Sequence, residues 1–439
     1  MNSFPRANGL DGLRGLAAAA VVLLHVWMFS GAHDASQPIL LDETVGAMGL
    51  ALMMFFVLSG YLVSAPWIKV GLHGGPAPDL WRYAVRRAAR ILPAYWISVV
   101  ASYVVMASIE HPLAIGFNEL PLFAVFAQNQ ATATAGQLNP PLWSLGVEVM
   151  FYVAFPVIGG LLIAAIRRWG RAGALVVAAA LTAFGLLWTT YAHLTGDDPL
   201  LVASLPTYLP IFACGIATAA LLHGRTIDRA QRTVLLVAGA ALVVLDGWWH
   251  HDSTGLAGHV LRDLPAGVGF AMVAAAVAQG PAWVLGSPPL RRLGDYSYGI
   301  YLWHMPVLYV LRHDERWPQS PWEAFAVVFG IATILGALSW HLIEHRVATW
   351  ASTRLRTRPP AAPNNDELPA RPVAPTGSLT PTSASVLGLA GGHRPHQRRP
   401  HRSGHEQRTH LTWAPPSNHL AGHDERPVVR VRRVAQARR

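Results

Sequence analysis

Ten apolar runs, each long enough to cross a lipid bilayer, recur along the chain up to residue 343. A transmembrane helix needs about 20 mostly apolar residues, whereas a membrane β-strand shows about ten residues of alternating polarity. The runs therefore predict an all-α protein, a polytopic membrane helix bundle with about ten transmembrane helices. They lie at 12–30, 45–65, 91–109, 142–166, 172–190, 202–222, 233–249, 264–284, 294–311 and 322–343. A shorter apolar piece at 119–128 cannot span, and we expect it to be interfacial or re-entrant.

Charged residues are few and unevenly placed. They make up 13% of the 439 residues, about half the fraction that is usual in soluble domains. The net charge of +10 comes from residues 351–439, which hold 15 arginines against 5 acidic residues, while residues 1–350 are neutral overall. We therefore expect a transmembrane domain at 1–350 and a disordered, basic tail rich in Pro, Arg and His at 351–439. We expect no nucleic acid partner.

The loops between the runs predict the orientation of the chain. With the N-terminus inside, sixteen Lys and Arg residues fall on the cytoplasmic side, and three, Arg262, Arg312 and Arg316, fall outside. Cytoplasmic loops carry an excess of basic residues in most membrane proteins. The sequence therefore predicts a multi-pass protein of the plasma (inner) membrane, with the lipid bilayer around it and both termini cytoplasmic.

Two ionisable residues stand at the ends of the first run. Arg14 and His25 are eleven residues apart, a rotation within about 20° of whole turns, so both project from one helix face, about 16 Å apart along the axis. Ionisable groups inside a bilayer are costly, and this marks the pair as a functional site. The alternative is structural, with Arg14 reaching the interface and His25 satisfied within the bundle.

The fourth run carries a buried carboxylate. Glu148 lies one helical turn after Ser144, which follows Trp143, and its depth in the membrane is similar to that of His25. A carboxylate that faces an imidazole fixes its tautomer and raises its basicity. We therefore expect Glu148 to orient His25, with a purely structural ion pair as the alternative.

The third run is preceded by an arginine cluster. Arg86 and Arg90 share a helix face, and arginine forks at a helix entry suit phosphate groups. Positive-inside anchoring is the alternative explanation. Two further runs carry polar residues that favour an interior position: Ser59 at the end of the second run, and Tyr298 and His304 in the ninth.

Taken together, these motifs resemble the acyltransferase 3 family of integral membrane acyltransferases, which O-acylate surface polysaccharides or antibiotic sugars. The resemblance covers residues 10–346 and rests on an ordered set: Leu10-Asp11-Gly12-Leu13-Arg14 with His25; Phe55 to Leu62; Arg86 to Arg90; Leu142-Trp143-Ser144-Leu145 with Glu148; Ser297 to His304; and Ile343-Glu344. A proline that often follows the last glutamate by two residues in the family is replaced by Arg346 in this chain.

The resemblance implies an enzyme that moves an acyl group, acetyl in the first instance, from cytoplasmic acyl-CoA to a hydroxyl of a carbohydrate or glycosylated acceptor. It implies that Arg14 and His25 are essential and that the arginine loop binds the donor. Catalysis is expected from His25, as general base or nucleophile, and from Glu148. Donor or substrate binding is expected from Arg14, Arg86, Arg90, Ser59, Trp143, Ser144, Tyr298 and His304. No metal is expected. The alternative is a transporter or flippase for a glycan or lipid-linked substrate, although the chain shows no internal repeat of the kind that transporters have.

Overall fold

The computed structural model describes residues 8–30, 39–252, 256–280, 284–314 and 316–357, and every regular element in these ranges is a helix. Ten helices have 15 residues or more: α1 (Asn8–Phe29), α3 (Ala51–His73), α4 (Leu80–Ser108), α6 (Leu142–Trp169), α7 (Arg171–Leu194), α9 (Leu205–Leu222), α10 (Arg229–Asp252), α12 (Leu264–Ala278), α13 (Pro288–His313) and α14 (Pro321–Ser339). Shorter helices are α2 (Ile39–Gly46), α5 (Leu120–Ala124), α8 (Pro199–Val202), α11 (Leu256–Val260) and α15 (His345–Thr357).

The long helices coincide with the ten predicted runs, which confirms the helix bundle. Within the described ranges, nine helical segments are both long and apolar enough to cross a membrane. The helix outside that group is α13, the predicted ninth run, which has 26 residues but carries Arg291, Arg292 and Asp295 near its start. The two arginines are exposed at the start of the helix. Farther along, the polar residues Ser297, Tyr298, Tyr301 and His304 are buried inside the protein.

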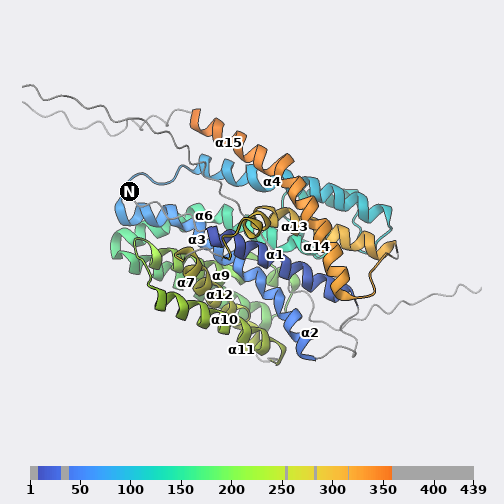
Figure 1. The fold of residues 1–439 in the computed structure, drawn as a ribbon. Coiled ribbons are helices and arrows are strands. Elements are labelled where there is room, and N and C mark those ends of the chain that lie inside the picture. The colour runs from blue at the N-terminus through green and yellow to red at the C-terminus, as the bar shows by residue number, and fades with distance from the viewer. Residues whose placement is uncertain (1–7, 31–38, 253–255, 281–283, 315, 358–439) are drawn as a thin grey trace, which may run out of the picture. The chain divides into compact units, whose positions relative to one another are not determined.

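Helix α1 is packed on several sides. It contacts α13 most extensively and also contacts α14, α3 and α12, as its position among these helices in Figure 1 shows. The contact with α13 is a backbone approach, because a Cβ atom on Gly294 would collide with the carbonyl of Asp11, and one on Gly15 would lie 3.0 Å from the Gly294 nitrogen. Small residues permit such close helix packing in membranes. These contacts therefore bring Arg14, which lies between Asp11 and Gly15 on α1, directly onto α13.

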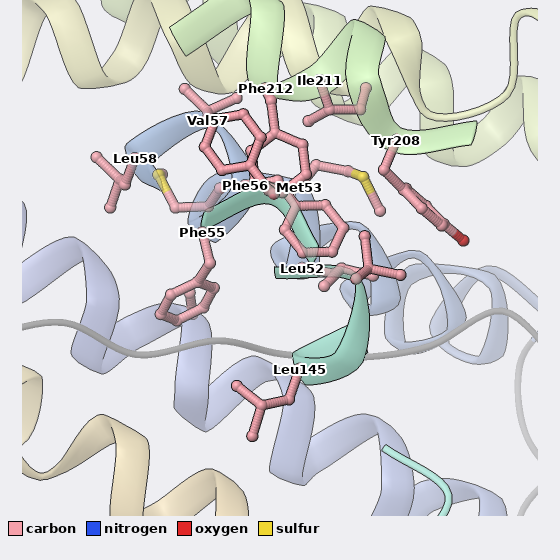
Figure 2. Close-up of a cluster of buried hydrophobic side chains, with 14 of the residues drawn as sticks. Leu52, Met53, Phe55, Phe56, Val57, Leu58, Leu145, Tyr208, Ile211 and Phe212 are labelled. Atoms are coloured by element: carbon pink, nitrogen blue, oxygen red, sulfur yellow. The ribbon is translucent and has the colours of Figure 1, made fainter. Parts of the chain in front are cut away.

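A second close crossing joins α3 to α9 and supplies much of the apolar core in Figure 2. The ring of Phe212 on α9 lies 4.7 Å from that of Phe56 on α3 and stacks on Phe151 of α6 at 3.9 Å. A Cβ atom on Gly60 would meet the carbonyl of Phe212, so this crossing also depends on a glycine. It fixes α3 and α6 relative to each other, and these two helices carry Ser59 and Glu148.

The predicted short apolar piece at 119–128 contains α5 (Leu120–Ala124), between 3₁₀ turns at Phe117–Glu119 and Gln128–Gln130. The buried amides of Gln128 and Asn129 donate to the carbonyls of Leu142 and Trp143, at 2.9 and 2.5 Å. The segment therefore holds the first turn of α6 in place, and with it the residues that follow Pro141.

The structure differs from the prediction at residues 351–357. Helix α15 continues to Thr357, so the start of the predicted 351–439 tail is helical. The physical reason is that Ala351 and Leu355, one turn apart, are buried at 2% and 4% exposure and supply an apolar face among arginines. The remainder, residues 358–439, lies outside the described residues.

Candidate functional site

Two histidines that are far apart in the sequence lie in contact inside the bundle. His25 on α1 and His304 on α13 are 2% and 0% exposed. Nε2 of His304 lies 3.3 Å from Nδ1 of His25, and the two rings are tilted by 49° with their centroids 5.0 Å apart. This pair lies about three helical turns from Arg14 along α1, which corresponds to about 16 Å.

The backbone contacts of the pair assign its tautomers. Nδ1 of His304 lies 2.6 Å from the carbonyl oxygen of Tyr301, and Nδ1 of His25 lies 2.9 Å from that of Val21. A carbonyl only accepts, so each Nδ1 carries a hydrogen when the rings are neutral. The single Nδ1–H of His25 is then shared between the carbonyl oxygen of Val21, at 2.9 Å, and the lone pair on Nε2 of His304, at 3.3 Å. Nε2 of His25 carries a lone pair too, as a general base requires.

The next polar contact connects the histidine pair to α6. The hydroxyl of Tyr301, on α13, lies 3.0 Å from Oγ of Ser144 and donates to the carbonyl of Pro141. Oγ of Ser144 also donates to that carbonyl, at 3.0 Å. The predicted site residue Ser144 therefore contacts the side chain of Tyr301, whose backbone carbonyl contacts His304.

Glu148 is held by two hydroxyl groups. Ser59 of α3 and Tyr152 of α6 donate to the same oxygen, Oε1, at 2.5 and 2.6 Å. Oε2 of Glu148 is buried and accepts no hydrogen bond among the described residues. The expected contact between Glu148 and His25 is replaced by these contacts, and His304 takes the place beside His25. Similar depth in the membrane did not place the two groups face to face, because Glu148 points from α6 toward α3.

The other end of α1 carries a buried arginine. Arg14 is 1% exposed, and its guanidinium lies 3.3 Å from Oδ1 of Asp11 and donates to Oγ of Ser297 at 3.3 Å. It also interacts electrostatically with Asp295 and Glu148. A buried charge is tolerated only with such partners, so the Asp11 and Gly15 of the first motif serve to hold Arg14 in the bundle.

Two arginines of the predicted loop turn toward this end of the site, and one does not. Arg90 interacts electrostatically with Arg14 and Glu344, and the guanidinium of Arg87 lies 5.0 Å above the ring of Tyr152. Arg86 is exposed on α4. The sequence spacing gave the shared face of Arg86 and Arg90 but not which of them faces inward.

Glu344 belongs to a π-helical turn, Trp340–Glu344, between α14 and α15. Its carboxylate is 2% exposed, and Ser339 donates to it at 2.7 Å. Single π-helical turns often occur at functional sites, where they redirect a side chain. Here the turn places the carboxylate of Glu344 where it interacts electrostatically with Arg90 and Arg14. Glu344 therefore lies beside the arginine end of the site, although the proline of the family pattern is absent two residues later.

The two remaining predicted residues are aromatic and lie beside this network. The hydroxyl of Tyr298 donates to the carbonyl of Ile91 at 2.8 Å, which joins α13 to α4 close to Arg90. Trp143 is 3% exposed, and its ring lies 5.2 Å from that of Tyr208. Sequence analysis missed Arg87, Tyr152 and Tyr301. Arg87 and Tyr301 lie inside two of the motifs, Arg86 to Arg90 and Ser297 to His304, but were given no role. The signal for Tyr152 was its position four residues after Glu148 on the same helix face.

Comparisons with known proteins agree on one family. Residues 7–341 match the profile of a family described as an acyltransferase domain. Nodulation protein 10 of Rhizobium leguminosarum bv. viciae is 29% identical over 360 residues, which cover 77% of this chain and 92% of the relative. No solved structure matches the chain significantly.

Two further relatives are longer than the matched region. A provisionally named O-acetyltransferase of Staphylococcus aureus (strain COL) is 23% identical over 366 residues, or 76% of this chain and 56% of the relative. A provisionally named peptidoglycan O-acetyltransferase of Bacillus subtilis (strain 168) is 27% identical over 373 residues, or 78% of this chain and 55% of the relative. The chain therefore spans little more than half the length of these two relatives.

Proposed function

The chain belongs to the acyltransferase 3 family of membrane acyltransferases, and we propose that it transfers an acyl group from cytoplasmic acyl-CoA to a hydroxyl of a carbohydrate or glycosylated acceptor. The names of the Staphylococcus and Bacillus relatives favour an O-acetyl group, and the Bacillus name favours a cell-wall glycan as acceptor. Acetyl-CoA is then the donor.

The observation that carries this proposal is the pairing of His25 with His304. His304 accepts the Nδ1–H of His25 and so directs the basic Nε2 of His25 toward the reacting atoms. Nε2 takes the proton of the acceptor hydroxyl as its oxygen attacks the thioester carbonyl. The C–S bond of the thioester breaks. His25 gives the proton to the CoA sulfur, and CoA leaves as the free thiol. The same nitrogen is also placed to take the acyl group itself and pass it on.

The arginines at the other end of α1 suit the donor. We assign the CoA phosphates to Arg14 and Arg90, with Arg87 beside them and the exposed Arg86 nearer to the aqueous phase. Planar guanidinium groups bind phosphate oxygens through paired hydrogen bonds. Glu344 and Asp11 stabilise this positive cluster in the absence of donor. An extended pantetheine arm then covers the roughly 16 Å of α1 between the arginines and His25.

We place Glu148 between the arginine end and the histidine end of the site. One of its carboxylate oxygens, Oε2, accepts no hydrogen bond among the described residues. Because its Oε2 is buried without a hydrogen bond among the described residues, a ligand donor such as a pantetheine amide satisfies it. Buried polar atoms in native proteins are satisfied in all but a few cases. We therefore assign Glu148 to the binding of the donor arm, alongside Ser59, Ser144, Trp143 and Tyr298.

The orientation inferred from the loops completes the proposal. With both termini cytoplasmic, the arginine end faces the compartment that contains acyl-CoA, and the acceptor reaches His25 from the opposite side of the plasma membrane. Access needs local separation of the helices, because Arg14, His25, Ser144, Glu148 and His304 are at most 2% exposed.

The experiment uses purified protein in liposomes with acetyl-labelled acetyl-CoA and a panel of glycans. We expect release of free CoA together with base-labile label on one glycan. Movement of a glycan across the membrane without any release of CoA supports the transporter or flippase alternative and contradicts the proposal.

A further inference from the structure

Three potential metal ligands converge away from the site described above. His193 lies in the last turn of α7, Asp197 follows that helix, and His259 lies on α11. Nδ1 of His193 is 2.9 Å from Oδ2 of Asp197, and Nε2 of His259 is 3.9 Å from the same oxygen. The two imidazole rings stack with centroids 4.1 Å apart. One ligand atom from each residue lies within 4.8 Å of the others.

These separations match the edges of a metal coordination polyhedron. Zinc binds imidazole nitrogen and carboxylate oxygen at about 2.0–2.2 Å, which puts tetrahedral ligand atoms about 3.3 Å apart. The two measured edges, 2.9 and 3.9 Å, lie on either side of that value. Two imidazoles and one carboxylate also form a ligand set that suits zinc and its neighbours in the first transition series, rather than Mg²⁺ or Ca²⁺.

The cluster opens onto a pocket. Asp197 and His259 line it together with Arg262, Asp263 and Tyr208. Three protein ligands leave a coordination position for water or a ligand atom, as in zinc sites that are not purely structural. We propose that His193, Asp197 and His259 bind one divalent transition-metal ion of the zinc class, which ties α11 to the end of α7 and presents its remaining position to this pocket.

This site was not predicted from the sequence, from which no metal was expected. His193 and Asp197 have a helical i, i+4 spacing, but His259 follows 62 residues later, on a separate short helix. Such spacing matches no local metal-binding motif. The site lies on α7 and α11, apart from the arginine and histidine network, so its test is independent of acyl transfer.

The test is binding of Co²⁺ and Zn²⁺ to the purified full-length protein in detergent. Bound metal per chain is measured by elemental analysis, and the coordination of Co²⁺ by its visible absorption, which is stronger for four-coordinate than for six-coordinate ions. We expect the parent to hold one four-coordinate Co²⁺ that Zn²⁺ displaces. His193→Gln and His259→Gln each lose that ion and its absorption, and Asp197→Asn weakens binding at least tenfold.

The control variant is His313→Gln, which removes an exposed histidine at the end of α13. It retains the ion if the proposal holds. Loss of the ion from His193→Gln and His259→Gln, which keep the seven histidines of residues 358–439, shows that those histidines do not hold it. Equal stoichiometry and equal spectra in the parent and both histidine variants overturn the proposal, as does an absence of four-coordinate Co²⁺ in the parent. Each variant is first shown to elute as a monodisperse, helical protein, and a variant that fails this check is replaced by the corresponding asparagine.

Discussion

Nε2 of His304 lies 3.3 Å from Nδ1 of His25, although the two residues are 279 positions apart in the chain. Nδ1 of each imidazole also contacts a backbone carbonyl of its own helix, that of Tyr301 for His304 and that of Val21 for His25. The pair therefore sets both the tautomer and the direction of His25. His304 acts through His25 and is a positioning residue in the proposed reaction.

The first prediction concerns that positioning contact. His304→Leu removes one of the two acceptors that share the Nδ1–H of His25 and leaves the carbonyl of Val21. A neutral hydrogen bond contributes about 0.5–1.5 kcal/mol, so kcat falls up to about tenfold while the KM for the donor is unchanged. His304→Gln keeps an amide oxygen at this position and retains more activity than the leucine variant. Steady-state kinetics with acetyl-CoA provide the check. A purely structural role predicts that both variants lose activity equally.

The second prediction concerns Glu148. Glu148→Ala removes the acceptor that the hydroxyls of Ser59 and Tyr152 share. These hydroxyls lie 3.0 Å apart, so one donates to the other and one is left unsatisfied, which costs about 1–3 kcal/mol. Glu148→Gln keeps one carbonyl oxygen for both. We therefore expect the alanine variant to unfold at a clearly lower temperature than the glutamine variant, by roughly 2 kcal/mol of stability. Tryptophan fluorescence during heating measures this, and equal midpoints for the two variants contradict the described contacts.

The third prediction separates two arginines of one helix. Arg90→Lys keeps the charge that topology needs but loses the planar fork. A charge-assisted hydrogen bond contributes about 1.5–3 kcal/mol, so the donor Kd rises about tenfold or more. Arg86→Lys changes it less than about fivefold, since exposed ion pairs contribute at most about 1 kcal/mol. Donor binding is measured with topology verified by accessibility labelling. If Arg90→Lys binds the donor as tightly as the parent does, the assignment of Arg90 to the CoA phosphates is wrong.

The fourth prediction concerns pH and the residue after α9. Partial burial, with repulsion from His73, Arg171 and Lys69, lowers the pKa of His223 below its ordinary value of about 6.5. As pH falls through 6.5, the unfolded chain takes up a proton here before the folded chain does, so the folded state loses stability. Protonation also competes with the 2.9 Å hydrogen bond between Nε2 of His73 and Nε2 of His223.

We therefore expect the apparent Tm of the parent to fall between pH 7.5 and pH 5.5 by more than that of His223→Gln. The matched control is His313→Gln, which removes an exposed histidine and keeps the parent's dependence on pH. Identical pH dependence of Tm in the parent and His223→Gln shows that this histidine contributes nothing to it.

The sequence was sufficient for the helices, for a physical reason. Bilayer thickness sets the length of each apolar run, so the ten runs predicted ten long helices, including the polar α13. Helical spacing likewise predicted that Arg14 and His25 lie on one face of α1. Neither argument depends on how helices are arranged around each other.

The contacts between helices were not predicted from the sequence, because they depend on how the helices are arranged around each other. Distance along a helix gives the depth of Glu148 in the membrane but not its direction, and the structure directs it to Ser59 instead of His25. The contact between His25 and His304 needs α1 beside α13, which the glycine contact of Gly294 with Asp11 determines. The half-buried position of Arg90 and the exposure of Arg86 depend in the same way on which face of α4 meets the bundle.

The most direct measurement is the rate of CoA release from acetyl-CoA by His25→Ala in liposomes, with the parent and His313→Gln measured alongside. Loss of a general base typically lowers the rate by about 10²–10⁴-fold. We therefore expect a loss of that size in His25→Ala, with unchanged insertion, unchanged donor binding at the arginine cluster and parent-like activity in the control. Turnover by correctly inserted His25→Ala close to that of the parent would contradict the assignment of His25 as the catalytic group.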